Sequence, residues 1–326
     1  MKFRPLGRTG IAVSQLCMGT MPFGGEADES ACAAMYQAAR TAGINFFDTA
    51  DQYNAGRAEE ILGKLMQGHR DDLVIATKGF NPMGSDINAK GASRRHLSRA
   101  CEATLKRLGT DRVEIYYVHN QDPRTPLEET LRGLEDLVRA GKILYPALSN
   151  HTAWQTQAAL DIQRANRWAP LQLIQPMYNL LKRTAEIEIL PMATANHLSV
   201  VPYGPSAGGL LSGKYAGDRA TVAGRINQNP MYAQRYAEPW AFDTAARFAE
   251  FCAARDVHPV SMAVAWVAAH PAVTAPIIGA RDVEQMQASL DAVNIDMNTA
   301  LRAEIAALSP APPSATDRSE ELMRKS

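Results

Sequence analysis

The chain has 326 residues, of which 46% are hydrophobic and 21% charged, and its 34 basic residues balance 34 acidic ones. This hydrophobic fraction allows a large core and excludes a disordered chain. Because the charge is balanced and no basic run interrupts it, nothing attracts nucleic acid or an anionic membrane surface, and we expect neither as a partner.

The N-terminal sequence and the cysteines predict a cytoplasmic protein. Pro5 and Gly7 break the first residues before an apolar run develops, so no signal peptide is predicted. The most apolar stretch, residues 262–269, is too short to cross a bilayer. The four cysteines are widely spaced without a C-x-x-C pair, which predicts free thiols in a reducing compartment and no metal site; they are Cys17, Cys32, Cys101 and Cys252.

A short apolar run, a polar loop and an amphipathic stretch recur along the chain. Strands are predicted at 15–18, 44–47, 73–76, 113–118, 143–148, 172–174, 198–201 and 275–278. Helices are predicted between them at 29–42, 58–67, 93–108, 126–140 and 152–165. Such alternation indicates a parallel sheet, and eight units favour a closed (β/α)₈ barrel over an open doubly wound sheet.

The two ends of the chain add to this α/β architecture. Residues 2–13 precede the first barrel strand and carry Gly7 and Gly10, which predicts a small hairpin closing the bottom of the barrel. After Leu308 a Pro-rich segment begins. We therefore predict one domain over residues 1–307 and a flexible tail over 308–326.

Polar residues directly follow each predicted strand, where eight loops of a barrel converge on one mouth. In chain order from the second strand to the eighth they are Asp48 and Tyr53, Thr77 and Lys78, His119 and Asn120, Ser149 and Asn150, Gln175, Tyr203, and Gly279 with Arg281. Any of these taken singly has an ordinary structural explanation, such as a helix cap, a solvated lysine or a core histidine. Their joint placement after successive strands favours a functional site.

This set of side chains suits proton transfer to a carbonyl oxygen. A buried Lys78 ammonium near the Tyr53 hydroxyl would favour the phenolate and lower the pKa of Tyr53 toward neutrality, and Asp48 would hold that ammonium. His119 could hydrogen-bond the substrate oxygen. The set contains no strong nucleophile with its base, so hydride must come from a cofactor.

Several motifs resemble, in order and spacing, those of the aldo-keto reductases. They are Gly19-Thr20-Met21, Asp48-Thr49-Ala50-x-x-Tyr53, Thr77-Lys78, Tyr117-Val118-His119, Leu148-Ser149-Asn150, Gln175-Pro176-x-Tyr178-Asn179, Gly209 to Tyr215, and Ile277 to Arg281. The resemblance covers about residues 1–307 and points to the branch that includes bacterial general aldehyde reductases and potassium-channel β subunits.

The resemblance implies an NADP(H)-dependent oxidoreductase that reduces aldehydes or ketones reversibly, with Tyr53 as general acid and base and Asp48, Lys78 and His119 as its helpers. The residues it assigns to the cofactor are Gly19, Thr20, Met21, Asp48, Ser149, Asn150, Gln175, Tyr203, Gly204, Pro205, Ser206, Gly208, Leu210, Lys214, Gly279, Arg281, Gln285 and Ser289. Arg281 and Gln285 would meet the 2′-phosphate of the adenosine, which favours NADP(H) over NAD(H).

The substrate is a small carbonyl compound or alcohol whose identity the sequence does not predict, and it predicts no oligomeric state. The residues expected to line its pocket are Met21, Phe23, Tyr53, Phe80, His119 and Asn120. Residues 216–240 are expected to lie over the cofactor or substrate. Ala288 and Ser289 stand where the family branch has Glu and Asn, which predicts a looser hold on adenine, and Asn120-Gln121 predicts atypical specificity.

Two other functions are compatible with the sequence. The channel-β resemblance allows a nicotinamide-binding subunit that senses redox state with little turnover. Gly204 to Gly208 also matches the G-x-S-x-G motif of serine hydrolases, with Ser206 as nucleophile and His258 or His270 as base. The glycines that follow are too many for the long helix such a nucleophile needs, so the hydrolase is the more remote of the two.

Overall fold

The protein was analysed as a computed structural model, which describes residues 1–215, 222–316, 318 and 320. Eight parallel strands form one sheet: β3 (Cys17–Gly19), β4 (Phe46–Asp48), β5 (Val74–Gly79), β6 (Val113–Val118), β7 (Ile143–Ser149), β8 (Leu173–Gln175), β9 (Ser199–Val200) and β10 (Ile277–Ile278). Each pairs with the next, and β10 pairs with β3. The N–H of Thr274 donates to the carbonyl of Val200 at 2.8 Å, which joins the two ends of the sheet. The predicted (β/α)₈ barrel is confirmed.

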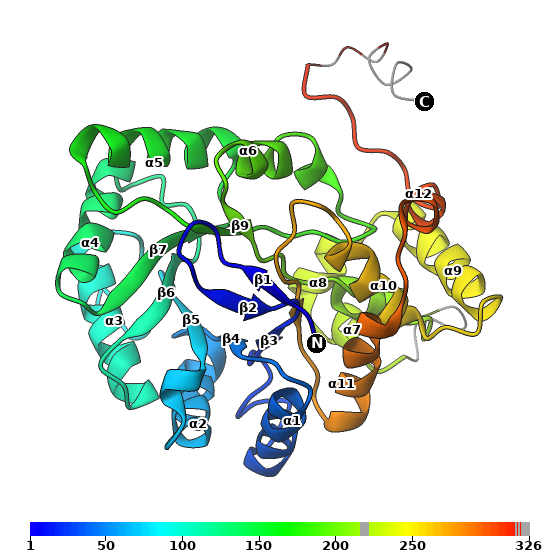
Figure 1. Cartoon of the computed structure of the whole chain (residues 1–326), viewed down its shortest axis with the longest axis horizontal. Helices are drawn as coiled ribbons and strands as arrows, with labels where there is room; N and C mark the ends of the chain where they lie inside the picture. Colours follow the sequence, from blue (N-terminus) through cyan, green and yellow to red (C-terminus); the bar gives the residue numbers. More distant parts are fainter. Residues whose placement is uncertain (216–221, 317, 319, 321–326) are drawn as a thin grey trace.

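Helices surround the strands (Figure 1). The α-helices are α1 (Glu29–Thr41), α2 (Arg57–Leu65), α3 (Arg94–Leu108), α4 (Leu127–Arg139), α5 (Ala153–Asn166), α6 (Ile189–Ala195), α7 (Arg225–Gln228), α8 (Pro230–Arg235), α9 (Pro239–Ala253), α10 (Pro259–Ala268), α11 (Val283–Leu290) and α12 (Thr299–Ala306). Short 3₁₀ helices are η1 (Tyr53–Gly56), η2 (Arg70–Asp72), η3 (Thr184–Glu186), η4 (Ala207–Ser212) and η6 (Asp291–Asn294). The five helices predicted from the sequence correspond to α1–α5, and β6 has its predicted bounds.

An antiparallel hairpin closes the bottom of the barrel, as predicted. Its strands are β1 (Phe3–Pro5) and β2 (Ala12–Ser14), and Figure 1 shows this blue hairpin across the middle of the ring of strands. Leu6 and Val13 are fully buried among the side chains of the barrel interior. The N–H of Gly7 also donates to the Ser199 hydroxyl at 2.6 Å, which ties the hairpin to β9.

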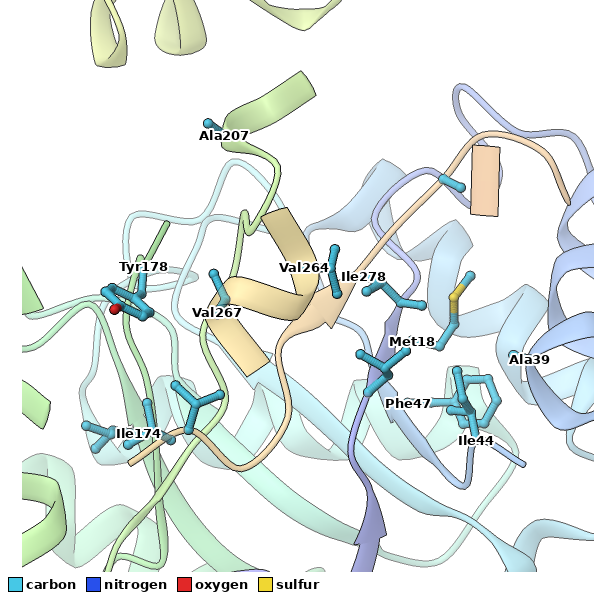
Figure 2. Close-up of a cluster of buried hydrophobic side chains, with 14 of the residues drawn as sticks. Met18, Ala39, Ile44, Phe47, Ile174, Tyr178, Ala207, Val264, Val267 and Ile278 are labelled. Carbon is cyan, nitrogen blue, oxygen red and sulfur yellow. The ribbon is translucent and has the colours of Figure 1, made fainter. Parts of the chain in front are cut away.

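A second apolar layer lies between the strands and the helices. Figure 2 shows part of it, with Met18 and Ile278 from adjacent strands near Val264 of α10. Phe47 of β4 lies on the same outer side with Ala39 of α1. Burial of such side chains is the main favourable contribution to folding, and it holds the strand ends that carry the polar residues in place.

Alternation along the strands places the polar residues inside the barrel mouth. Successive side chains of a strand point to opposite faces, so every second residue faces the interior. The interior cluster includes Phe46, Val74, Ala76, Ile115, Tyr117, Ala147, Leu173 and Val201. On each of these strands a polar residue follows two positions after the last apolar residue that faces the interior. These polar residues are Asp48, Lys78, His119, Ser149, Gln175 and Tyr203. The polar site is therefore the top layer of the same interior.

The C-terminal segment begins in contact with the barrel. The carbonyl of Leu308 accepts a hydrogen bond from Arg247 at 3.0 Å, and Ser309 is buried. Residues 317, 319 and 321–326 of the predicted tail lie outside the described residues, as do residues 216–221. No helix in the described part of the chain is long and apolar enough to cross a membrane.

Candidate active site

A cavity of about 1020 Å³ opens among the loops that follow the barrel strands. The predicted site residues that line it are Gly19, Met21, Asp48, Tyr53, His119, Asn120, Ser149, Asn150, Gln175, Tyr203, Gly204, Pro205, Ser206, Gly208, Lys214, Gly279, Arg281, Gln285 and Ser289. One continuous cavity thus brings together residues from β3 to α11. Its volume is at the upper end of the range usual for small-molecule sites.

The structure places five other predicted residues outside the cavity lining. Phe23 is fully buried in the outer apolar layer, and Phe80 packs against that layer, so neither presents its ring to the cavity. Leu210 is likewise a core residue. Thr20 is buried and donates its N–H to the carbonyl of Asp48 at 2.9 Å, so it supports the site from behind. Lys78 is fully buried beneath the cavity floor.

Lys78 joins the predicted acid to its helpers. Its Nζ donates to Asp48 Oδ1 at 2.5 Å, to the carbonyl of Thr49 at 2.7 Å and to the Tyr53 hydroxyl oxygen at 3.2 Å. An ammonium group has three protons, so all of its hydrogen-bonding capacity is used. Since the Tyr53 oxygen accepts from Lys78, the hydrogen of that hydroxyl is free to be donated into the cavity.

The charge state of this cluster follows from burial and from the ion pair. Burial alone would lower the pKa of Lys78, but the negative charge of Asp48 and the oxygen of Tyr53 raise it above its ordinary value. Burial raises the pKa of Tyr53, and the positive charge of Lys78 opposes that shift without overcoming it. The prediction that the pKa of Tyr53 is lowered toward neutrality is therefore wrong for the protein without a bound cofactor. The cost of burying the charged phenolate is larger than its attraction to the Lys78 ammonium. Tyr53 is held in its protonated, proton-donating form.

His119 is neutral and its ring has a defined hydrogen-bonding direction. Burial, and then the charge of Lys78, lowers the pKa of His119 to about 3. The side-chain amide of Asn81 lies 3.3 Å from Nδ1, and an amide N–H donates there, which leaves the proton of the ring on Nε2. The rings of Tyr53 and His119 meet edge to face at 6.2 Å between centroids. Two neutral hydrogen-bond donors thus line the same cavity.

Hydrogen bonds link residues that follow β7, β8 and β9 to Asp48 and to the backbone of His119. Gln175 Nε2 donates to Asp48 Oδ2 at 2.8 Å, and the Ser149 hydroxyl donates to the carbonyl of Gln175 at 3.0 Å. The Tyr203 hydroxyl donates to Asn150 Oδ1 at 2.7 Å. Asn150 in turn donates to the carbonyl of His119 at 3.0 Å. These bonds fix the ring of Tyr203 and the amide groups that were predicted to hold nicotinamide.

The far end of the cavity carries a cluster of cations. Among the described residues, Lys214 donates a hydrogen bond only to the carbonyl of Ala223, at 3.2 Å, and Arg281 donates only to the Gln285 side chain. Burial lowers the pKa of Lys214, and the charges of Arg281 and Arg225 lower it further. Repulsion within such a cluster is relieved by a bound anion. The residues therefore fit the phosphate groups of a dinucleotide.

A buried carboxyl group, Asp51, lies in the loop between Asp48 and Tyr53. It is fully buried, and neither of its oxygens has a hydrogen-bond partner in the described part of the chain. Burial, followed by the negative charge of Glu59, raises its pKa to about 7. Glu59 itself accepts from Thr77 and Arg107, each at 2.6 Å, and forms an ion pair with Arg107.

Asp51 is expected to make folding stability depend on pH. The folded state holds a proton that the unfolded chain releases, so the stabilisation is complete below about pH 4 and is lost as the pH rises through about 7. Asp51→Asn removes this dependence and raises the free energy of unfolding at pH 8 relative to the parent, by at most about 4 kcal/mol. Urea unfolding at several pH values measures it.

The exposed Asp71, paired with Arg112, offers a control for this experiment. Asp71→Asn should leave the pH dependence of the parent in place. An Asp51→Asn protein whose free energy of unfolding changes with pH as the parent's does would contradict the role given to Asp51.

The structure gives Ser206 none of the support that a hydrolase nucleophile needs. Gly208 and Gly209 have positive φ angles of 66° and 90°, so the following segment is a kinked 3₁₀ turn and not a long helix. His258 uses its Nδ1 to accept from the N–H of Val260, and His270 does the same for Ala272. In the described chain no histidine bonds to Ser206, which removes the basis of the hydrolase interpretation.

Sequence reasoning missed several side chains that line the cavity. Asn81 follows β5, and its position in the loop after Lys78 is the signal that could have found it. Arg235 comes from α8, within the segment 216–240 that was expected to cover the site. The described part of that segment does line the cavity. No pattern singled out Arg235, because α8 is too short for its face to be read from the sequence.

The fold and the polar cluster define a (β/α)₈-barrel protein with a buried Asp–Lys–Tyr site beside a cavity of about 1020 Å³. Comparison with known proteins agrees: residues 15–309 match the aldo/keto reductase family. The chain therefore belongs to the aldo-keto reductase family of oxidoreductases, as the motifs predicted.

Named relatives cover nearly the whole chain. An uncharacterized oxidoreductase of Bacillus subtilis, YrpG, is 39% identical, with 91% of this chain and 93% of the relative aligned. A probable voltage-gated potassium channel subunit beta of Oryza sativa is 34% identical over 90% of this chain and 92% of its own length. The L-glyceraldehyde 3-phosphate reductase of Escherichia coli is 30% identical over 90% and 88%. The predicted branch of the family is confirmed.

Proposed function

We propose that this protein is an NADP(H)-dependent oxidoreductase that reduces an aldehyde or ketone to an alcohol, reversibly, with Tyr53 as the proton donor. The observation that carries the proposal is the hydrogen-bonded series Asp48–Lys78–Tyr53, with Lys78 fully buried and the Tyr53 hydroxyl facing the cavity. A fixed proton donor above a buried cation is the arrangement that stabilises charge developing on a carbonyl oxygen.

Each side chain of the cluster has its own role in the proposed reaction. Nicotinamide, when bound, supplies hydride to the carbonyl carbon. The Nε2–H of His119 orients the carbonyl oxygen, and Tyr53 gives its proton to that oxygen. The Lys78 ammonium stabilises the phenolate left on Tyr53, and Asp48 keeps Lys78 charged and in place. In alcohol oxidation the same phenolate takes the proton back.

For the cofactor, we assign Ser149, Asn150 and Gln175 to the nicotinamide amide group and Tyr203 to the ring face. The hydrogen bonds that already fix these side chains support the assignment, because a positioned donor costs less entropy on binding. Lys214, with the backbone of the loop that begins at Gly204, would hold the pyrophosphate. Ser289 and Ala288 border the cavity near Arg281, at the adenine end.

Arg281 is expected to set the preference for NADP(H). Its guanidinium has no carboxylate partner in the described chain and matches a phosphate dianion bidentately. Arg281→Gln should therefore weaken NADPH binding about 10- to 100-fold and leave NADH binding nearly unchanged. Fluorescence titration with the two cofactors measures both constants. Equal weakening for NADPH and NADH would contradict the assignment.

A second candidate function is a nicotinamide-binding redox sensor with little turnover, which the relatedness to plant channel subunits supports. A panel of aldehydes and ketones, incubated with NADPH and separately with NADH, distinguishes the two. If each protein molecule oxidises many cofactor molecules in the presence of at least one carbonyl compound, the protein is an enzyme. Binding of NADPH without repeated turnover of any compound favours the sensor.

A further inference from the structure

Arg235 of α8 lines the same cavity as Tyr53 and His119. Four acidic residues line the cavity: Asp48 pairs with Lys78, Glu26 pairs with Arg225, Asp282 caps α11, and Glu284 lies in the first turn of α11. In the described part of the chain, Arg235 forms no ion pair. Its nearest contacts are Met231 Sδ at 3.5 Å and the ring of Tyr232, 5.0 Å from the guanidinium carbon.

The helix that carries Arg235 is fixed against the barrel loops. Asn229 caps it by accepting from the N–H of Met231 at 3.0 Å. At its end Tyr236 is buried, and its hydroxyl accepts from Asn179 at 3.1 Å. The ring of Tyr232 lies so close to Gly208 that a Cβ there would stand 2.6 Å from it. Arg235 is therefore presented on a rigid element and not on a loose loop.

Arg235 contacts the ring of Tyr232, which lines the cavity together with Tyr203 and Tyr53. Burial raises the pKa of the Tyr203 hydroxyl, and the positive charge of Arg235 opposes that shift. Tyr232, which touches Arg235, is also close enough to Tyr53 to act on the charge of its hydroxyl. The phosphate-binding cations, Lys214 and Arg281, belong to the loops after β9 and β10. Arg235 is thus an unneutralised cation close to the reacting groups.

We propose that Arg235 binds an anionic group of the substrate, so that the preferred substrates are aldehydes or ketones that carry a carboxylate or a phosphate. The guanidinium fork matches either anion bidentately. Because Arg235 is half-buried and has no ion-pair partner among the described residues, it leaves a net positive charge in the cavity that the substrate must enter. Asn120 and Asn81 add amide groups to the lining of the same cavity. This inference rests on the proposed carbonyl reductase activity and names its substrate class.

The first test compares two aldehydes of nearly equal shape, 4-carboxybenzaldehyde and its neutral methyl ester, with NADPH. The parent protein should prefer the carboxylate, mainly through a lower KM. Arg235→Gln should lower kcat/KM for the carboxylate about 10- to 100-fold and that for the ester by less than about threefold. Arg235→Lys should give an intermediate value, because it keeps the charge but not the planar fork.

A second pair, glyceraldehyde 3-phosphate and glyceraldehyde, tells the two anions apart. In each pair, the preference for the charged over the neutral aldehyde is compared between the parent and Arg235→Gln. If the variant loses more of this preference in the benzaldehyde pair, the anion bound by Arg235 is a carboxylate. If it loses more in the glyceraldehyde pair, the anion is a phosphate. The control is Arg235→Gln combined with Gln234→Lys, which restores the charge on an exposed neighbour outside the cavity. This double variant should keep the loss seen in Arg235→Gln.

The outcomes separate this inference from the proposed function. Reduction of both neutral aldehydes without any preference for the charged ones overturns the substrate class while the reductase proposal stands. Equal losses for charged and neutral aldehydes in Arg235→Gln also overturn it. If no aldehyde is reduced, calorimetry of the NADP⁺-bound protein with 4-methylbenzoate decides: binding that Arg235→Gln weakens at least about tenfold supports the anion site, and equal binding overturns it.

Discussion

Replacing Lys78 with Met should both unfold the protein more easily and stop its chemistry. Lys78 is fully buried, and Asp48, at 3% side-chain exposure, has no other cation within 4 Å in the described chain. Removing one partner of a buried ion pair leaves the other charge without compensation and costs about 3–5 kcal/mol of the free energy of unfolding. The phenolate of Tyr53 would lose its cation as well, so kcat should fall along with stability. Urea unfolding and steady-state kinetics measure the two effects.

The double variant Asp48→Asn with Lys78→Met provides the control for this effect. It removes both charges, so its loss of free energy of unfolding should be much smaller than the sum of the losses in the two single variants. Activity should nevertheless remain low, because the cation beside Tyr53 is still absent. A Lys78→Met protein within about 1 kcal/mol of the parent, where an exposed pair would fall, would contradict the buried ion pair as the basis of the site.

Replacing Tyr53 with Phe should lower kcat by about 10²- to 10⁴-fold, the usual contribution of a positioned general acid. The change removes one oxygen, which in the protein accepts a hydrogen bond from Lys78 at 3.2 Å and carries the transferable proton. Affinity for NADPH should be nearly unchanged, because the residues assigned to the cofactor do not depend on that hydroxyl.

The pH profile of the parent should also show no ionisation of His119 near neutrality, since burial lowers the pKa of that histidine to about 3.

Tyr116 gives a matched control for Tyr53. It lies on β6, is fully buried and has a hydroxyl without a hydrogen-bond partner in the described part of the chain, but it does not line the cavity. Tyr116→Phe removes the same atom from a buried tyrosine outside the site. It should keep kcat within about twofold of the parent, because no proton transfer passes through it.

The sequence was sufficient for the barrel and for the polar residues at its mouth, for one physical reason. Alternation along a strand is a local property, so Asp48 follows Phe46 and Lys78 follows Ala76 on the interior face without reference to the rest of the chain. The convergence of strand ends in a barrel then brings these residues together.

The remaining features depend on packing that the sequence does not display. Phe23 and Phe80 were assigned to the pocket by position, but their rings pack with the outer apolar layer. The direction of the pKa shift of Tyr53 required the balance between burial and the charge of Lys78, which only the structure provides. Arg235 gained its place in the cavity from the anchoring of a six-residue helix, α8, by Tyr232 and Tyr236.

The most direct test of the account is a single-turnover measurement with NADPH bound to the parent and to Tyr53→Phe, mixed with excess 4-carboxybenzaldehyde. Loss of NADPH absorbance reports the chemical step without product release. We expect the parent to oxidise its bound NADPH rapidly and Tyr53→Phe to do so at least about 10²-fold more slowly while holding the same amount of cofactor. A Tyr53→Phe protein that oxidises NADPH at the rate of the parent would contradict the assignment of Tyr53 as the proton donor.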